Sequence, residues 1–164
     1  MAMATEPVRV TGIAPVRRIV ENLKKFLASP KPMKLIVEDV DKRVDKLTAS
    51  GLDYKGKAFH EYSDGYKTWK KRKYGSSKVN LKASGKMLGA KKGIVHSART
   101  GEIRIESHGT GKRAKTDMLA NIHTTGTGKQ PQREFMAITD LAINKIVKKR
   151  INDPIIKIIG RRRI

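Results

Sequence analysis

Histidine is the residue type in this chain best suited to bind a metal ion or to transfer a proton. The chain has four histidines and no cysteine, and no histidine has a partner at a metal-ligand spacing. The four are His60, His96, His108 and His123. No serine lies in a Gly-x-Ser-x-Gly sequence, so the nucleophile elbow of α/β hydrolases is absent. The sequence therefore predicts no catalytic residue and no metal site.

Two Gly-Thr-Gly-Lys segments, at residues 109–112 and 126–129, superficially resemble phosphate-binding loops. A P-loop needs four residues between its glycines and a Ser or Thr after the lysine, and it follows a buried strand. Here one Thr separates the glycines, and Arg113 and Gln130 follow the two lysines. Both segments are expected to be flexible loops. We predict no cofactor and no enzymatic activity.

The charge of the chain points to a polyanion or an acidic surface as a partner. Its 164 residues include 37 Lys and Arg against 15 Asp and Glu, a formal net charge of +22. Basic side chains release counterions when they neutralise phosphates, and aromatic rings among them can stack on bases. Residues 52–92 hold twelve basic side chains and six of the eight aromatic ones. The candidate basic contacts are Lys70, Lys71, Arg72, Lys73, Arg161, Arg162 and Arg163.

Two N-terminal helices are predicted from apolar residues that recur every three or four positions. The first starts near Pro15, and residues 29–32, Ser-Pro-Lys-Pro, interrupt it. Its apolar stripe consists of Val16, Ile19, Val20, Leu23, Phe26 and Leu27. The second helix has Ser29 as its cap and Pro30 in its first turn, and it ends at Gly51.

The rest of the chain predicts shorter elements. Short helices are expected near residues 63–71 and 84–89, and alternating apolar residues over 94–107 indicate a β-hairpin that turns on Gly101. Residues 133–138 are predicted to form a third strand. Thr139 or Asp140 then caps a final helix, which the Asn-Asp-Pro sequence at 152–154 breaks.

Together these elements predict a single α+β domain over residues 14–151. It would contain the two N-terminal helices, a small antiparallel sheet with a β-hairpin, a C-terminal helix packed on that sheet, and a long basic loop region at residues 52–92. Residues 1–13 are expected to form an extended arm, and residues 152–164 an apolar and then basic tail. No run of eighteen apolar residues is present, so no membrane contact is expected.

Two motifs about forty residues apart, VNLKASGKML at 79–88 and NIHTTGTGKQPQREFM at 121–136, have residue types suited to turns and anchors. Their order and spacing resemble the virion-morphogenesis, or tail-completion, proteins of tailed bacteriophages, over roughly residues 51–151. The residues that match are Leu81, Ser84, Gly85, Leu88, His123, Gly126, Pro131, Arg133 and Phe135.

This resemblance implies a structural protein of the phage neck or tail, assembled in the host cytoplasm. It implies a homo-oligomeric ring that joins the head connector to the tail or terminates the tail, with connector and tail proteins as neighbours and passive contact with packaged DNA. Arg133 is expected to make planar contacts across an interface, and Phe135 to lie in the core. The alternative is a basic nucleic-acid-binding module of the ribosomal or nucleoid type.

Overall fold

The computed structural model describes residues 13–108, 115–127 and 130–160. Residues 1–12 of the expected arm, the first Gly-Thr-Gly-Lys segment and the arginines at 161–163 lie outside the described part of the chain. Within it the protein is an α+β structure. Its elements are α1 (Ile13–Ala28), α2 (Lys31–Ser50), α3 (Asp64–Tyr74), α4 (Lys86–Gly89), β1 (Lys91–Val95), β2 (Gly101–Ile105), α5 (Thr116–Thr125), α6 (Asp140–Val147), the π-helical turn η1 (Lys148–Asn152) and α7 (Asp153–Gly160).

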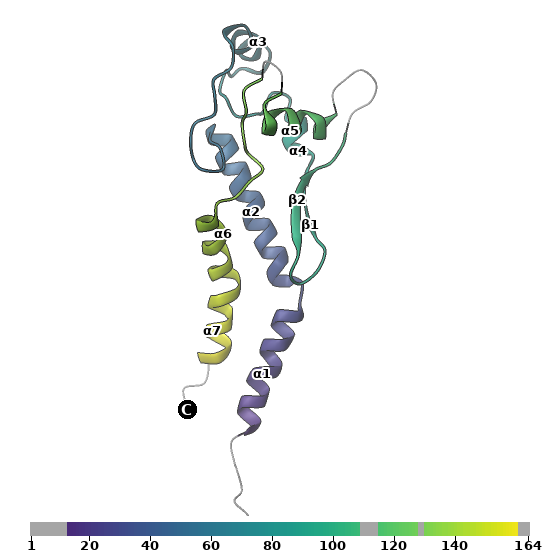
Figure 1. The fold of residues 1–164 in the computed structure, drawn as a ribbon, viewed down its shortest axis with the longest axis vertical. Helices are drawn as coiled ribbons and strands as arrows, with labels where there is room; N and C mark the ends of the chain where they lie inside the picture. The colour runs from purple at the N-terminus through teal and green to yellow at the C-terminus, as the bar shows by residue number, and fades with distance from the viewer. Residues whose placement is uncertain (1–12, 109–114, 128–129, 161–164) are drawn as a thin grey trace, which may run out of the picture.

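The two predicted N-terminal helices are α1 and α2, which follow each other along the long axis and lean to opposite sides of it (Figure 1). The N-cap of α2 is Pro30, so Ser29 is not the cap residue. The Ser29 Oγ instead accepts a hydrogen bond from the Lys31 backbone N–H at 3.3 Å. Gly51 ends α2 as predicted, in a left-handed conformation, and its N–H donates to the Thr48 carbonyl oxygen at 3.0 Å.

The predicted hairpin is present, and it packs directly on α2. Lys91 pairs with Ile105 and Val95 with Gly101, so Gly101 starts β2 and residues 96–100 form the turn. A Cβ atom at Gly93 or Gly101 would lie 2.6 Å from a methyl group of Val37 on α2. Glycine at both positions therefore lets the sheet backbone approach α2 closely.

The main core lies beside the C-terminal end of α2, among residues that are distant in sequence. Its buried side chains are Val44, Phe59, Val79, Leu81, Met87, Ala120 and Phe135. Four of these seven belong to residues 52–92, which were expected to form a long basic loop. The two short helices expected there are α3 and α4. The region is therefore part of the folded core, and most of its charged side chains are exposed around these anchors.

Residues 133–138 do not form the predicted third strand. The Arg133 N–H donates to the His123 carbonyl oxygen at 2.6 Å, and the Glu134 carbonyl oxygen accepts from the Tyr54 N–H at 3.1 Å. Phe135 is then buried, with 3% of its surface exposed. The backbone of this segment bonds α5 and residue 54 in turn, so it cannot also pair with the hairpin.

The C-terminal helix is longer than predicted and packs on α2, not on the sheet. Thr139 caps it as expected, since its Oγ1 accepts from the Ala142 N–H at 3.3 Å. The helix does not end near residue 152 but continues through η1 into α7. Pro154 has no N–H and its ring would crowd the carbonyl group four residues earlier, and the wider π turn before it relieves that conflict. Residues 152–160 are thus helical and no separate tail.

An ion pair attaches this helix to α2, and a groove lies between the two helices and β2. The guanidinium of Arg150 donates two hydrogen bonds to the Asp39 carboxylate, both at 2.7 Å, and it holds the pKa of Asp39 below its ordinary value. Between α2, β2 and the C-terminal helix lies a cavity of about 470 Å³ with mainly apolar walls, which include Val40, Ile103 and Val147.

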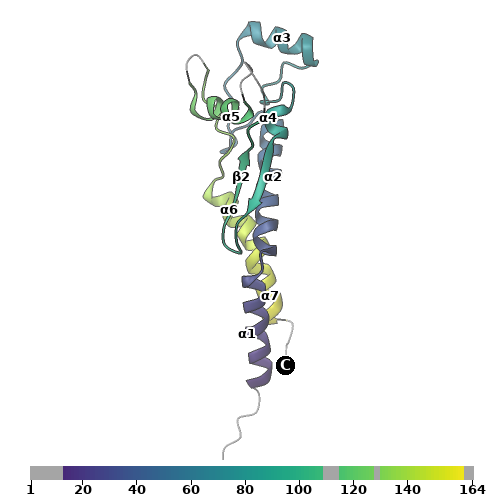
Figure 2. The ribbon, with the colours of Figure 1, turned by 90° about the vertical axis from the view of Figure 1, so that its right-hand side faces the viewer.

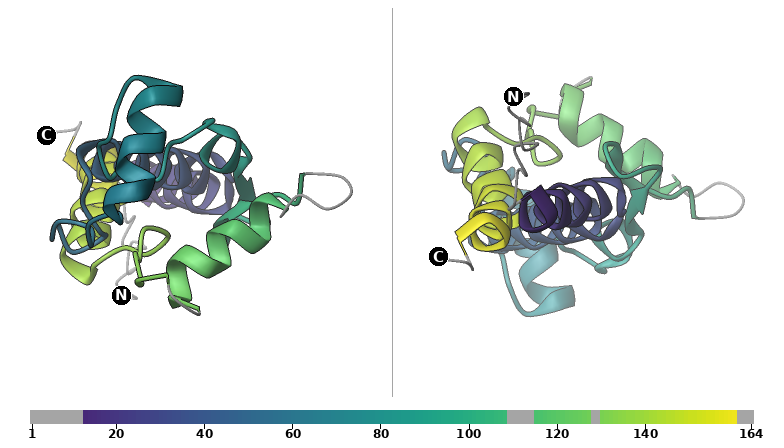
Figure 3. Two further views of the ribbon diagram at one scale, coloured as in Figure 1. Left: turned by 90° about the horizontal axis from the view of Figure 1, so that it is seen from above. Right: turned by 90° about the horizontal axis from the view of Figure 1, so that it is seen from below.

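The molecule is elongated, and its two ends differ in construction. One end holds α3, α4 and α5 around the C-terminus of α2 (Figures 1 and 2). The other end consists of α1 and α7, which pack against each other. Viewed along the long axis, α3 and α5 project to different sides (Figure 3). The broad end is referred to below as the head.

The close contact between β1 and α2 predicts that Gly93→Ala destabilises the fold by about 1–3 kcal/mol, the usual cost of overpacking. Val37→Ala alone also destabilises, because it leaves a cavity. In the double variant the two changes should partly compensate, so the loss of stability should be smaller than the sum of the two single losses. Urea unfolding of the parent protein, the two single variants and the double variant measures this difference. Gly89→Ala, where a Cβ meets nothing within 4 Å, is the control. Strict additivity of the two costs would contradict the contact.

Candidate functional site

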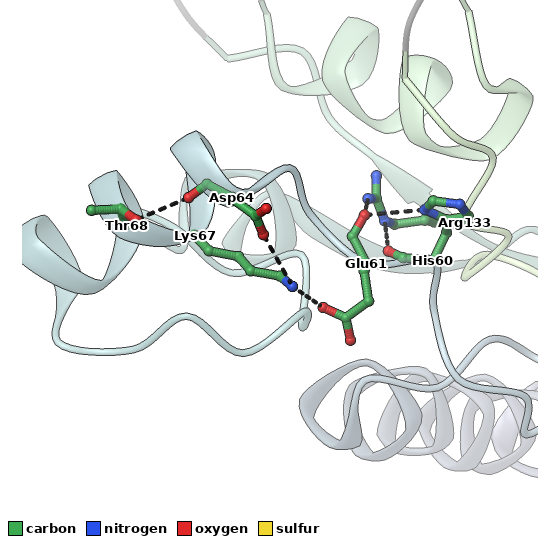
Figure 4. A network of polar contacts seen from close by, with 6 residues as sticks. All are labelled: His60, Glu61, Asp64, Lys67, Thr68 and Arg133. Carbon is green, nitrogen blue, oxygen red and sulfur yellow. Dashed lines mark hydrogen bonds and ion pairs between the residues drawn. The ribbon is translucent and has the colours of Figure 1, made fainter.

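Residues of the two sequence motifs lie in the head, where Leu81, Leu88 and Phe135 belong to the core cluster or pack against it. Arg133 connects separate segments there (Figure 4). Its Nε donates to the His60 carbonyl oxygen at 3.0 Å, and its Nη2 to the Glu61 carbonyl oxygen at 3.2 Å. Its Nη1 lies 3.5 Å from the Pro131 carbonyl oxygen. Only 2% of Arg133 is exposed. The expectation of a contact across an interface is therefore corrected, because Arg133 joins parts of its own chain.

Carbonyl oxygens and an aromatic ring stabilise this buried cation. Burial lowers the pKa of the Arg133 guanidinium, while the ring of Tyr62, centred 4.9 Å away, places negative potential beside it. The Glu61 carboxylate turns to Lys67 instead, with Oε2 at 2.9 Å from Nζ (Figure 4). Backbone carbonyl groups cannot move with the guanidinium group as a flexible side chain could. The hydrogen bonds of Arg133 therefore fix residues 60–62 and 131–133 relative to each other.

The first motif forms the approach to α4. Leu81 is buried with φ +53°, an uncommon conformation for a residue with a Cβ atom. Gly85, at φ +78°, precedes the first turn of α4, and the Lys86 N–H lies 3.5 Å from the Ser84 Oγ. Leu88 packs against the core cluster. These residues set the direction of the chain and anchor it.

The second motif closes α5 and leads to Arg133. Gly126 ends α5 at φ +70°, and a Cβ atom there would lie 2.8 Å from the Gln132 nitrogen. Phe135 belongs to the core, as predicted. The His123 ring is half-buried, and its Nδ1 has no hydrogen-bond partner among the described residues. Burial and the nearby Arg133 charge lower the pKa of His123 below the ordinary value of 6.5. All matched residues thus serve the fold of the head.

Lys70 is not a surface contact, contrary to expectation. It is 1% exposed, and its Nζ donates to the Lys78 carbonyl oxygen at 2.5 Å and to the Asn80 Oδ1 at 2.8 Å. Burial lowers the pKa of its ammonium group. Lys67 is also engaged, by Glu61 and Asp64. Lys70 therefore attaches α3 to residues 78–80, and Lys67 attaches the helix to the segment that leads into it.

Lys71, Arg72 and Lys73 are exposed on α3, as expected of basic contacts. They accompany a chain of aromatic rings in which Tyr66 and Trp69 are 5.1 Å apart and Trp69 and Tyr74 are 5.6 Å apart. Trp69 and Tyr74 are each 37% exposed. The Lys73 Nζ lies 5.3 Å from the Trp69 ring centre. The outer part of α3 thus presents cations and rings together.

Six of the eleven exposed large apolar side chains among the described residues lie at the other end, on α1 and α7. The predicted stripe on α1 is present, but the helix has no buried residue, and neither has α7. We define the outer stripe as the exposed apolar residues of the two helices, which are Ile13, Val16, Val20, Leu27, Ile156 and Ile159. The sequence showed the apolar face of α1, but only the long-range contacts show that α7 covers it incompletely.

The described residues contain neither a cluster of metal-binding side chains nor a helix of membrane-spanning length and hydropathy. No group of three or more His, Asp or Glu side chains among them lies close enough together to hold a metal ion. In the same part of the chain, no helix is both long enough and apolar enough to cross a bilayer. The candidate surfaces are therefore the outer stripe, the groove beside α2 and the basic aromatic face of α3.

Replacing Arg133 by methionine should destabilise the protein by about 3 kcal/mol, because buried carbonyl oxygens lose their donor. Gln132→Met, at the exposed neighbouring residue, should change the free energy of unfolding by less than about 0.5 kcal/mol. Urea denaturation of both variants measures the difference. Equal stability of Arg133→Met and the parent protein would show that the cation does not hold the head together.

The lowered pKa of His123 predicts a stability that depends on pH. Above pH 6.5 the ring is neutral in both folded and unfolded chains, so it contributes no pH dependence. Below that value the unfolded chain takes up a proton more readily, and stability falls as the pH drops. Urea unfolding between about pH 7.5 and 5.5 should show this fall. His123→Gln should flatten it, whereas the same change at the exposed His108 should not.

Comparisons with protein-family models, with curated proteins and with solved structures find no match to this chain. The roles of its surfaces therefore have to be inferred from its own contacts. Those contacts assign the motif residues to the internal structure of the head, and they leave two kinds of surface, apolar and basic, for partners.

Proposed function

We propose that this protein is a structural subunit of a tailed-phage virion, which assembles with copies of itself into a ring at the neck or tail. In this role it joins the head connector to the tail or terminates the tail, with connector and tail proteins as neighbours. The observation that carries the proposal is the outer stripe. Val16 is 60% exposed and Ile156 is 63% exposed, although both lie on amphipathic helices.

A second layer of helices would stabilise this end of the molecule. Helices bury their apolar stripes against neighbours, and α1 has α7 as its principal neighbour among the described elements. Exposed apolar patches of this kind mark sites of association. A copy of the same chain supplies the same kind of face, and contacts between different faces of neighbours close into a ring when the rotation permits.

The motif cluster supports the same function. Arg133, Phe135 and Gly126 make the head rigid and carry out no chemistry that the structure reveals. A rigid head and an apolar end suit a building block whose activity is assembly. The connecting role in the virion follows from the family resemblance of these motifs.

The alternative, a basic nucleic-acid-binding module, fits less well as the main function. Several basic side chains are used internally: Arg150 pairs with Asp39, Lys91 with Asp45, and Lys70 with carbonyl and amide oxygens. The net charge of +22 therefore overstates the basic surface that a phosphate backbone would meet. Arg150 and Lys91 therefore do not enlarge the basic surface that the exposed residues of α3 form.

Self-association through the outer stripe predicts one defined oligomer. Light scattering after size exclusion should give a single multiple of the 18.3 kDa chain mass, and electron microscopy should show rings. Val16→Glu with Val20→Glu places charge in the apolar contact and should shift the mass to the monomer while helicity stays unchanged. A parent protein that stays monomeric at all concentrations would contradict the proposal.

The control for this experiment removes the same net charge from another face of α1. Arg18 and Lys25 lie on the side away from Val16 at about 100° per residue, so Arg18→Gln with Lys25→Gln should leave the oligomer intact. Added salt should strengthen the association, because it screens repulsion between highly positive subunits. Binding to nucleic acid would respond in the opposite direction. Equal loss in both variants would indicate a charge effect and not the stripe.

A further inference from the structure

We propose that the outer part of α3 is a binding site for single-stranded nucleic acid, in which Trp69 and Tyr74 stack on unpaired bases and Arg72 and Lys73 bind the adjoining phosphates. This site does not rest on ring assembly, because α3 lies at the end of the molecule remote from α1 and α7 (Figures 1 and 2). It assigns a ligand to a region where, among the described residues, large rings and cations without an ion-pair partner are exposed together.

The rings form the physical basis of the site. Tyr62, Tyr66, Trp69 and Tyr74 follow one another with centroid separations of 4.8, 5.1 and 5.6 Å. Tyr62 and Tyr66 are half-buried and anchor the series, whereas Trp69 and Tyr74 each keep 37% of their surface exposed. A ring held by its neighbours loses little entropy when a base stacks on it. Stacking of this kind tolerates any base sequence.

The helical period shows which cation flanks which exposed ring. At about 100° per residue, Arg72 and Lys73 lie about 60° and 40° from Trp69 around α3, and Lys71 lies about 160° away. The Lys73 Nζ is indeed close to both exposed rings, 5.3 Å from the centre of Trp69 and 5.7 Å from that of Tyr74. Lys70 is buried and does not take part. Lys73 is therefore the cation that the two exposed rings share, while Arg72 flanks Trp69 and Lys71 flanks Tyr74.

The charge around α3 favours a polyanion. Residues 65–101 contain eleven Lys and Arg and no Asp or Glu. Among the described residues, no carboxylate lies within ion-pair distance of Lys71, Arg72 or Lys73. An acidic protein would satisfy the charges but would leave the rings without a matching flat partner. Nucleic acid supplies phosphates and flat bases at a regular spacing, so it matches both features.

Trp69 is the single tryptophan of the chain, so its fluorescence reports on the site directly. An oligothymidylate of about ten nucleotides, a common site size for single-strand binding, should quench this emission when titrated into the full-length protein. A DNA duplex of equal length, whose bases are already stacked, should quench it less. The affinity should fall as salt rises, with a log–log slope of about −1.4 for two phosphate contacts.

Variants identify the groups that bind, with a labelled oligothymidylate and its anisotropy as the readout. Trp69→Ala should weaken binding by about 5- to 150-fold, the range that corresponds to one stacked base. Trp69→Phe keeps an aromatic ring and should keep most of the affinity, which separates lost stacking from lost folding. Lys73→Glu should weaken binding more than Lys25→Glu on α1, although both variants change the net charge equally.

Two results would overturn the inference. The first is heparin or polyglutamate that binds as tightly as oligothymidylate and changes Trp69 emission as much, since neither has bases to stack. The second is equal affinity of the Trp69→Ala and parent proteins, or equal loss from Lys73→Glu and Lys25→Glu. Either result would make the face a general contact for acidic partners.

Discussion

The structure of the head depends on two buried cations beside one tyrosine. Arg133 and Lys70 lie 4.9 Å and 5.0 Å from the centre of the Tyr62 ring, and neither has a carboxylate within hydrogen-bond distance among the described residues. Their hydrogen bonds go to carbonyl oxygens and to the Asn80 amide. Burial raises the pKa of Tyr62 and lowers that of Lys70. Because unsatisfied buried groups are costly, residues 60–62, 70, 78–80 and 133 have to be in place together.

This arrangement also decides which basic residues remain available. Lys67 and Lys70 point towards the head and fix α3, so the exposed charge of the helix shifts to Lys71, Arg72 and Lys73. One run of lysines in the sequence thereby has two roles. The inward residues make the helix a firm support, and a firm support allows exposed rings to act as a preorganised contact surface.

Local signals in the sequence predicted much of the fold. Gly51 as a C-cap, Thr139 as an N-cap and the alternation around Ile103 each act within a few residues, and the structure contains all three elements. The role of Arg133 could not be predicted in this way, since its partner His60 is 73 residues away. The helix through Pro154 was missed because a π turn, not the proline, decides the local geometry. The periodicity of one segment carries no information about the contacts of that segment with distant parts of the chain.

The incomplete burial of α1 follows from the architecture. α1 packs mainly on one helix, α7, and its apolar stripe is wider than one neighbouring helix covers. Val16 and Val20 therefore stay exposed, while Ile19 and Leu23 are half-buried. Residues 31–50 avoid this problem, because α2 has the hairpin and the C-terminal helix as neighbours. The single chain thus buries the apolar side chains of its head more completely than those of its helical end. The apolar surface that remains exposed lies on α1 and α7, at the opposite end from the head, so covering it would leave the contacts of Arg133 unchanged.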